Sequence, residues 1–114
     1  MKYMLLICGE GGGPKLTPEE AAEIGPATDV WVEEMGRRGI RLEGSQLAPV
    51  SDATTVRVRA GELLISDGPF AETKEHIAGY DIIDCKDLDE AIEVASKHPV
   101  VKFGMIEVRP FWVD

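Results

Sequence analysis

The polar side chains that could do chemistry gather in one stretch, residues 66–80, which reads SDGPFAETKEHIAGY. Asp67 stands before a Gly-Pro pair, and His76 follows in the same stretch. A carboxylate and an imidazole can act as general base and general acid, because the pKa of histidine lies near neutral pH. Asp67 and His76 are therefore the candidate catalytic residues. The alternative is that Asp67 hydrogen-bonds its own turn and that His76 is a surface loop residue.

Four other polar residues are candidate ligand-binding groups: Glu72, Lys74, Tyr80 and Arg109. The Arg109 guanidinium could hold a carboxylate through two parallel hydrogen bonds, and the Tyr80 hydroxyl could bond to a ligand. Glu72 and His76 are four residues apart, so a short helical turn would set them side by side. This pair has no third ligand at a firm spacing, and we expect neither a metal nor a cofactor.

The elements that must position these residues begin with an apolar strand over residues 2–8. Thr17-Pro18-Glu19-Glu20 then predicts a capped helix that ends near Gly36, with Pro26 as a bend or a fresh start inside it. Its apolar face comprises Ala21, Ile24, Thr28, Trp31 and Met35. A second strand is expected over residues 41–47, with Leu42 pointing inward and Leu47 as a second candidate for the inward face.

A hairpin follows, because residues 54–59 and 62–66 read as strands on either side of Ala60-Gly61. Residues 80–85 predict another strand, and Asp87 caps a second helix, at whose end His98 is a cap-region residue. The apolar stripe of this helix is expected to be Leu88, Ala91, Ile92 and Ala95. The last strand is expected over residues 102–113, with Met105 packed and with Phe103 and Phe111 as further candidates for packing. Pro110 marks an edge strand or ends the regular part of this strand.

Without the hairpin, this order is β-α-β-β-α-β, so the fold class is α+β, a ferredoxin-like unit with an inserted β-hairpin. A chain of 114 residues is expected to form a single domain, residues 1–114. Two helices cover one face of an antiparallel sheet, and the chain offers no third layer for the other face. We therefore expect a homodimer, in which a second copy covers the uncovered face.

The net charge of −9 disfavours binding to nucleic acid or to an anionic membrane, since both depend on clustered Lys and Arg. No secretory signal and no apolar run of membrane-spanning length is present, so the cytoplasm is the expected location. Cys8 and Cys85 lie in apolar runs and are expected to pack as small buried hydrophobic residues without forming a disulfide.

The run Asp67-Gly68-Pro69-Phe70-Ala71-Glu72-Thr73-Lys74-Glu75, followed by Gly79-Tyr80, closely resembles the signature of DGPF-domain proteins, a subgroup of the YCII-related (YciI-like) family. The looser similarity extends from residues 2–6 to residues 107–110. The resemblance implies a dimeric α+β barrel whose two sheets face each other, an association with extracytoplasmic-function-type sigma factors, and an Asp–His catalytic pair. That histidine belongs on the first helix, and residues 17–38 contain none.

These observations favour a dimeric small-molecule-binding or sensing protein, with a pocket between the helices, the sheet and residues 67–80, and with a link to sigma-factor regulation. The alternative is a cofactor-free enzyme, isomerase- or hydrolase-like, that uses Asp67 as its base. A third hypothesis is a structural interaction module. The sequence leaves the ligand, and the choice between binding and catalysis, open.

Overall fold

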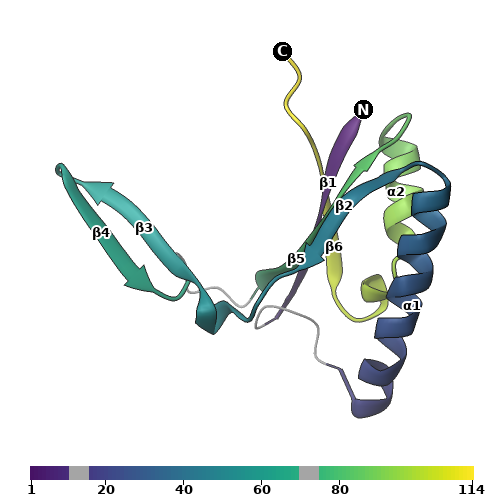
Figure 1. Ribbon diagram of the computed structural model, residues 1–114, viewed down its shortest axis with the longest axis horizontal. Coiled ribbons are helices and arrows are strands. Elements are labelled where there is room, and N and C mark those ends of the chain that lie inside the picture. Colours follow the sequence, from purple (N-terminus) through teal and green to yellow (C-terminus); the bar gives the residue numbers. More distant parts are fainter. Residues whose placement is uncertain (11–15, 70–74) are drawn as a thin grey trace.

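The computed structural model of the 114-residue chain describes residues 1–10, 16–69 and 75–114. Its main body is a sheet of four antiparallel strands in the order β2-β5-β1-β6, with two helices on one side (Figure 1). The strands are β1 (Lys2–Glu10), β2 (Arg41–Gln46), β5 (Glu75–Asp84) and β6 (Met105–Pro110), and the helices are α1 (Pro18–Arg37) and α2 (Leu88–Ser96). This mixed arrangement is consistent with the predicted ferredoxin-like α+β fold.

Both helices begin at the predicted caps. The Thr17 hydroxyl accepts a hydrogen bond from the Glu20 amide at 3.2 Å, and the Glu20 carboxylate accepts one from the Thr17 amide at 2.9 Å. Asp87 accepts from the Glu90 amide at 2.9 Å in the same way. These bonds satisfy amide groups that have no partner inside the helix. Helix α1 runs on through Pro26 as one element, rather than starting afresh there.

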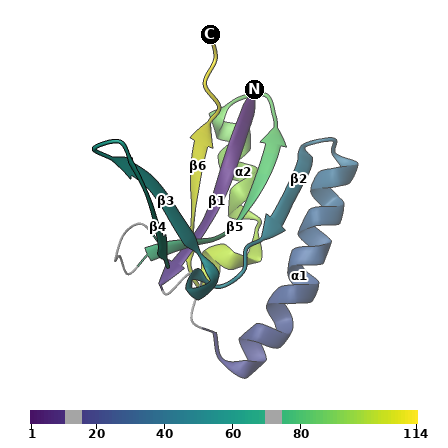
Figure 2. The same ribbon diagram turned by 60° about the vertical axis from the view of Figure 1, so that its left-hand side comes forward.

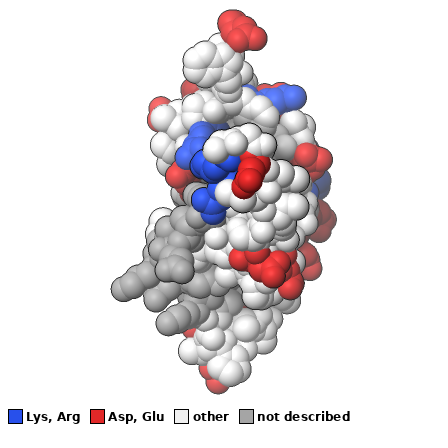
Figure 3. All heavy atoms as spheres, turned by 90° about the vertical axis from the view of Figure 1, so that its left-hand side faces the viewer, with Lys and Arg blue, Asp and Glu red and all other residues white. Residues whose placement is uncertain are grey.

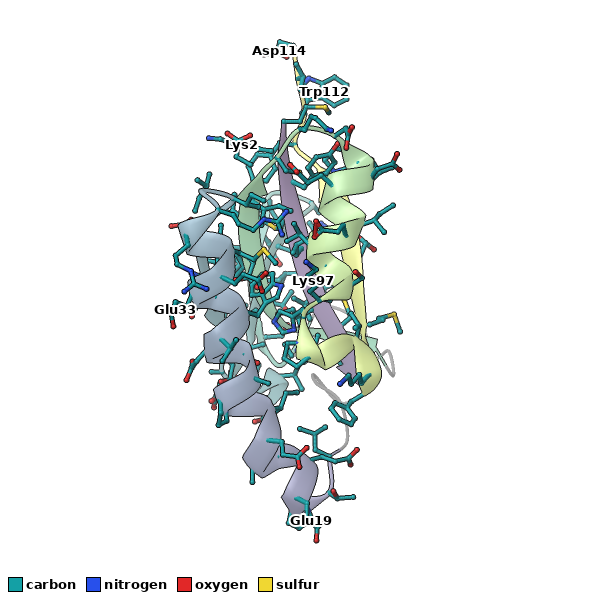
Figure 4. The ribbon with its side chains drawn as sticks, turned by 90° about the vertical axis from the view of Figure 1, so that its right-hand side faces the viewer. Lys2, Glu19, Glu33, Lys97, Trp112 and Asp114 are labelled. Atoms are coloured by element: carbon teal, nitrogen blue, oxygen red, sulfur yellow. The ribbon has the colours of Figure 1, made fainter. Side chains whose placement is uncertain are left out.

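The hydrophobic core lies between the sheet and the helices (Figure 4). Its fully buried members include Leu5, Ile83, Met35 and Val94, from four different elements. Trp31 is buried, as predicted, and its indole N–H donates to the Val94 carbonyl at 2.9 Å, which ties α1 to the end of α2. The first half of α1 extends beyond the sheet, and its side chains are mostly exposed.

The predicted hairpin is confirmed and forms a sheet of its own. Strands β3 (Thr54–Arg59) and β4 (Glu62–Asp67) pair around Ala60 and Gly61, whose positive φ angles of 51° and 78° suit the tight turn of a two-residue hairpin. A short 3-10 helix, η1 (Val50–Asp52), precedes it. The hairpin projects away from the body on the side without helices (Figures 1 and 2).

The inward faces of two elements differ from the prediction. Leu42 is 50% exposed, because a register irregularity between Arg41 and Glu43 turns it out of the core. On α2, Leu88 and Ile92 are about half exposed, whereas Ala91, Val94 and Ala95 are buried. The helix therefore lies on the sheet through its small residues, which permit a close approach.

Element boundaries differ as well. Strand β5 begins at Glu75, five residues before the predicted start at Tyr80, because β1 is long enough to pair with it as far as Glu10. Lys102 belongs to a 3-10 helix, η2 (Pro99–Lys102), and not to the last strand. Met105 and Phe111 are exposed to 49% and 38% instead of packed, while Phe103 is half-buried. β6 is an edge strand, as Pro110 indicated.

Cys85 is buried, as predicted, and Cys8 is half-buried; within the described residues, no disulfide joins them. No helix in the described part of the chain has the length and apolarity to cross a membrane.

Candidate functional site

One face of the four-stranded sheet faces away from the helices. Leu5 and Ile83 point to the helices and are fully buried. Side chains alternate between the faces of a sheet, so their neighbours Met4, Leu6 and Ile82 point to the opposite side. Among the described residues, no helix lies over that side (Figures 1 and 2). We call it the open face.

Two rows of paired residues cross the open face from β2 to β6. They are Ser45, Tyr80, Leu6 and Glu107 in one row, and Glu43, Ile82, Met4 and Arg109 in the other. Each row is polar at the β6 edge and at the β2 edge, and largely apolar between them. Tyr80 and Arg109, two of the predicted ligand-binding residues, therefore share this face, one on each side of β1.

Arg109 is held only loosely at the edge of the open face. Its Nη2 lies 2.6 Å from Oε2 of Glu107, and the two side chains are 67% and 49% exposed. An ion pair this exposed contributes at most about 1 kcal/mol, because water screens the charges. The guanidinium can therefore exchange this partner for a ligand carboxylate, which it would meet with paired hydrogen bonds.

Asp67, the predicted catalytic base, lies in the other sheet. It is the last residue of β4, opposite Thr54, and its side chain is exposed. The corner after it is fixed by other groups: the Gly68 amide donates to the Ala53 carbonyl at 2.7 Å, and the Thr55 hydroxyl donates to the Gly68 carbonyl at 2.8 Å. Within residues 1–10, 16–69 and 75–114, no ion pair involves Asp67.

His76, the predicted acid, lies in β5 and not in a loop. It pairs with Gly9 of β1 and is half-buried. Asp67 and His76 therefore occupy different sheets. Glu72 and Lys74 lie outside the described residues. The sequence spacing would have set Glu72 beside His76 only on a helical turn, and His76 lies on no such turn, because the chain is a β-strand from Glu75 to Asp84.

The sequence analysis missed a buried ion pair within the sheet, between Arg41 of β2 and Asp81 of β5. Arg41 Nε donates to Asp81 Oδ1 at 2.8 Å, and the Asp81 side chain is only 6% exposed. Burial raises the pKa of the Asp81 carboxyl, although the hydrogen bond and the charge of Arg41 act to lower it. Gly44, paired with Asp81, leaves room for the carboxylate, since a Cβ there would collide with Asp81 Oδ1.

His98 is buried and lies in the cap region at the end of α2, as predicted, directly after the C-cap Lys97. It is also the N-cap of η2, because its Nδ1 accepts from the Val100 amide at 3.1 Å. Its ring meets Trp31 edge-on, with centroids 4.7 Å apart. Burial, helped by the charge of Arg41, lowers the pKa of His98 to about 4, so it is neutral at pH 7. A neutral imidazole that accepts a backbone hydrogen bond is a structural group.

Comparison with known proteins gives the chain its family. It is 46% identical over 68 residues to an uncharacterised protein of Rhizobium meliloti (strain 1021), a match that covers 58% of this chain and 55% of that relative. The chain thus spans about half the length of the relative. The YCII-related domain matches residues 1–113, nearly the whole sequence. The chain therefore belongs to the YCII-related domain family.

Proposed function

We propose that the protein is a homodimer that binds a small molecule between the open faces of two copies. The observation that carries this proposal is the composition of the open face, where Met4, Leu6 and Ile82 form an apolar centre on a side that none of the described helices covers. Apolar surface gains roughly 25 cal/mol for each Å² removed from water, which favours a second sheet as its cover. A twofold pair would then enclose the polar groups at the two sheet edges.

The ligand that fits this face has a carboxylate and a short apolar body. Arg109 supplies the charge that would meet the carboxylate, and Tyr80 supplies a hydroxyl across β1, with Leu6 and Met4 between them. Sites of this kind combine an apolar lining with a few polar groups that set the orientation.

Substitution of Ile82 tests the dimer. Ile82→Glu places a charge in the middle of the open face, and Val30→Glu places the same charge on the exposed side of α1, where Val30 is 64% exposed. We expect the wild type and the Val30→Glu variant to have the mass of a dimer by size exclusion with light scattering, and Ile82→Glu to have that of a monomer. A wild type that stays monomeric at every concentration would rule out the paired-sheet proposal.

Substitution of Arg109 tests the ligand. Thermal shifts would be recorded against a panel of small carboxylic acids. Arg109→Gln removes the proposed partner, while Arg37→Gln removes an arginine of similar exposure, at 69%, whose ion pair with Glu33 lies on α1. An acid that stabilises the wild type and Arg37→Gln, but binds Arg109→Gln at least about tenfold more weakly, supports the site. Equal stabilisation of all three proteins places the ligand elsewhere.

Asp67→Ala belongs in the same screen, because the enzyme alternative depends on Asp67. Catalysis by this residue requires an enclosed carboxylate with a partner, and Asp67 is exposed in the single chain. A ligand lost on Asp67→Ala but kept on Arg109→Gln would favour the alternative over the proposal. Membership of the DGPF subgroup, a cytoplasmic location and a link to a sigma factor are also proposals, and they rest on the sequence alone.

A further inference from the structure

We propose that the β3–β4 hairpin is an arm that packs on a second copy of this chain through one of its two faces. This inference rests on the homodimer proposed above and adds a second contact to it. The arm face consists of Val56 and Val58 on β3, and Leu63 and Ile65 on β4. Val56 is paired with Ile65, and Val58 with Leu63, so all four side chains lie on the same side of the hairpin.

The arm face is exposed in the single chain. Its four side chains are between 58% and 64% exposed, more than most apolar residues of the body. A two-stranded hairpin in water is marginally stable without a layer packed on it. The hairpin nevertheless projects from the body (Figure 1), and the hydrogen bonds at its base, from the Gly68 amide to the Ala53 carbonyl and from the Thr55 hydroxyl to the Gly68 carbonyl, join the two ends of the hairpin to each other. A covering layer from another molecule would explain this combination.

The size of the open face also favours a second contact. The outer strands of the sheet are six residues long. The length of the strands multiplied by the width of four strands gives the open face a flat area on the order of 400 Å². A stable interface takes about 800 Å² from each partner. The arm leaves the body on the same side as the open face, as the views in Figures 1 and 2 agree. A copy seated on the open face is therefore within reach of the arm.

Charge favours another copy of the chain as the partner. The whole chain carries −9, which opposes contact between two copies. Residues 54–67 hold two arginines, Arg57 and Arg59, and two acidic residues, Glu62 and Asp67, so the arm has no net charge. Figure 3, which views the molecule from the side of the arm, shows Lys and Arg gathered near the middle of this face, with Asp and Glu beside and below them. The arm can thus approach an acidic copy without the repulsion that the body meets.

Two adjacent leucines give a matched test. Leu63 belongs to the arm face and Leu64, opposite Arg57, points to the other side of the hairpin. We expect Leu63→Ser to raise the Kd of the dimer by about tenfold in dilution by analytical ultracentrifugation, and Leu64→Ser to change it less than about threefold. If the protein dimerises and Leu63→Ser and Leu64→Ser have the same Kd, the arm is not at the interface. The proposed dimer through the two open faces would remain.

Leu63→Ser could raise the Kd by destabilising the hairpin itself, so hydrogen exchange of the wild type provides a test without a substitution. The amides of residues 56–65 should exchange at least about tenfold more slowly above the Kd than below it. In the Ile82→Glu variant they should exchange rapidly at both concentrations. If the wild type dimerises and the exchange rates of these amides do not depend on concentration, the arm does not pack on a second copy. A wild type that never dimerises would overturn the arm and the proposed function together.

Discussion

At the scale of single residues, His98 links the stability of the fold to pH. Its pKa is about 4 in the folded protein, against 6.5 for an ordinary histidine. Between these values the unfolded chain binds more protons than the folded one, so the free energy of unfolding falls as the pH drops from about 6.5 to 4. The shift corresponds to a loss of about 3 kcal/mol over that range. Urea denaturation at a series of pH values measures it.

His98→Asn isolates this contribution, because asparagine can still accept the hydrogen bond from the Val100 amide. Asp81 acts with the opposite sign: its raised pKa makes the folded protein bind the extra proton, which adds stability as the pH falls. Asp81 is present in both proteins, so the difference between their pH profiles reports His98. Parallel profiles of the wild type and His98→Asn would show that the imidazole titrates normally.

The burial of Asp81 and of His98 could not be predicted from the sequence. In the run Tyr80-Asp81-Ile82-Ile83, strand alternation puts either Asp81 and Ile83 or Tyr80 and Ile82 toward the core, and two adjacent isoleucines do not decide between them. The register with β1 decides it, because Leu5 is paired with Asp81 and Tyr3 with Ile83. The roles of Tyr80 and Arg109 as ligand-binding residues stay predictions, although the open face now gives both a common location.

At the scale of the elements, the approach of β2 to β5 depends on Gly44. A Cβ at this position would lie 2.6 Å from the Tyr80 carbonyl oxygen and 2.8 Å from the Arg41 guanidinium, as well as against Asp81. We expect Gly44→Ala to lower the free energy of unfolding by about 1–3 kcal/mol, because the strand or the ion pair must move. Chemical denaturation at pH 7 measures this change.

Gly36→Ala is the matched control for Gly44→Ala. Gly36 lies near the end of α1, and nothing lies within 4 Å of the Cβ that alanine would add. Alanine is the better helix former, so this variant should gain about 0.5–1 kcal/mol. A Gly44→Ala protein as stable as the wild type would mean that β2 lies farther from β5 than the structure places it.

The elements that local chemistry specifies were predicted well. The caps at Thr17 and Asp87 and the turn at Ala60-Gly61 involve residues at most three positions apart, so the sequence contains the whole interaction. The buried side of α2 was not predictable in this way. Stripes through Leu88 and Ile92 or through Val94 are both helical, and the choice between them is made by packing on the sheet.

At the scale of the whole molecule, the layers followed from element order, but the direction of the hairpin did not. Hydrogen bonds within β3 and β4 specify the hairpin, while its angle to the body depends on contacts outside it. The Cα radius of gyration is 16.0 Å, against about 13 Å for a compact domain of this length. The projecting arm contributes to this difference, together with the first half of α1, which extends beyond the sheet.

Small-angle X-ray scattering of the Ile82→Glu variant tests this shape, because the variant is expected to be monomeric. An arm held away from the body predicts a radius of gyration near 16 Å, together with a maximum dimension near the 48 Å of the longest axis. An arm that folds onto its own open face predicts a value near 13 Å, as for a compact chain. Such a compact monomer would show that the arm covers the open face of its own chain. The apolar faces of both sheets would then be buried within one chain, without a second copy.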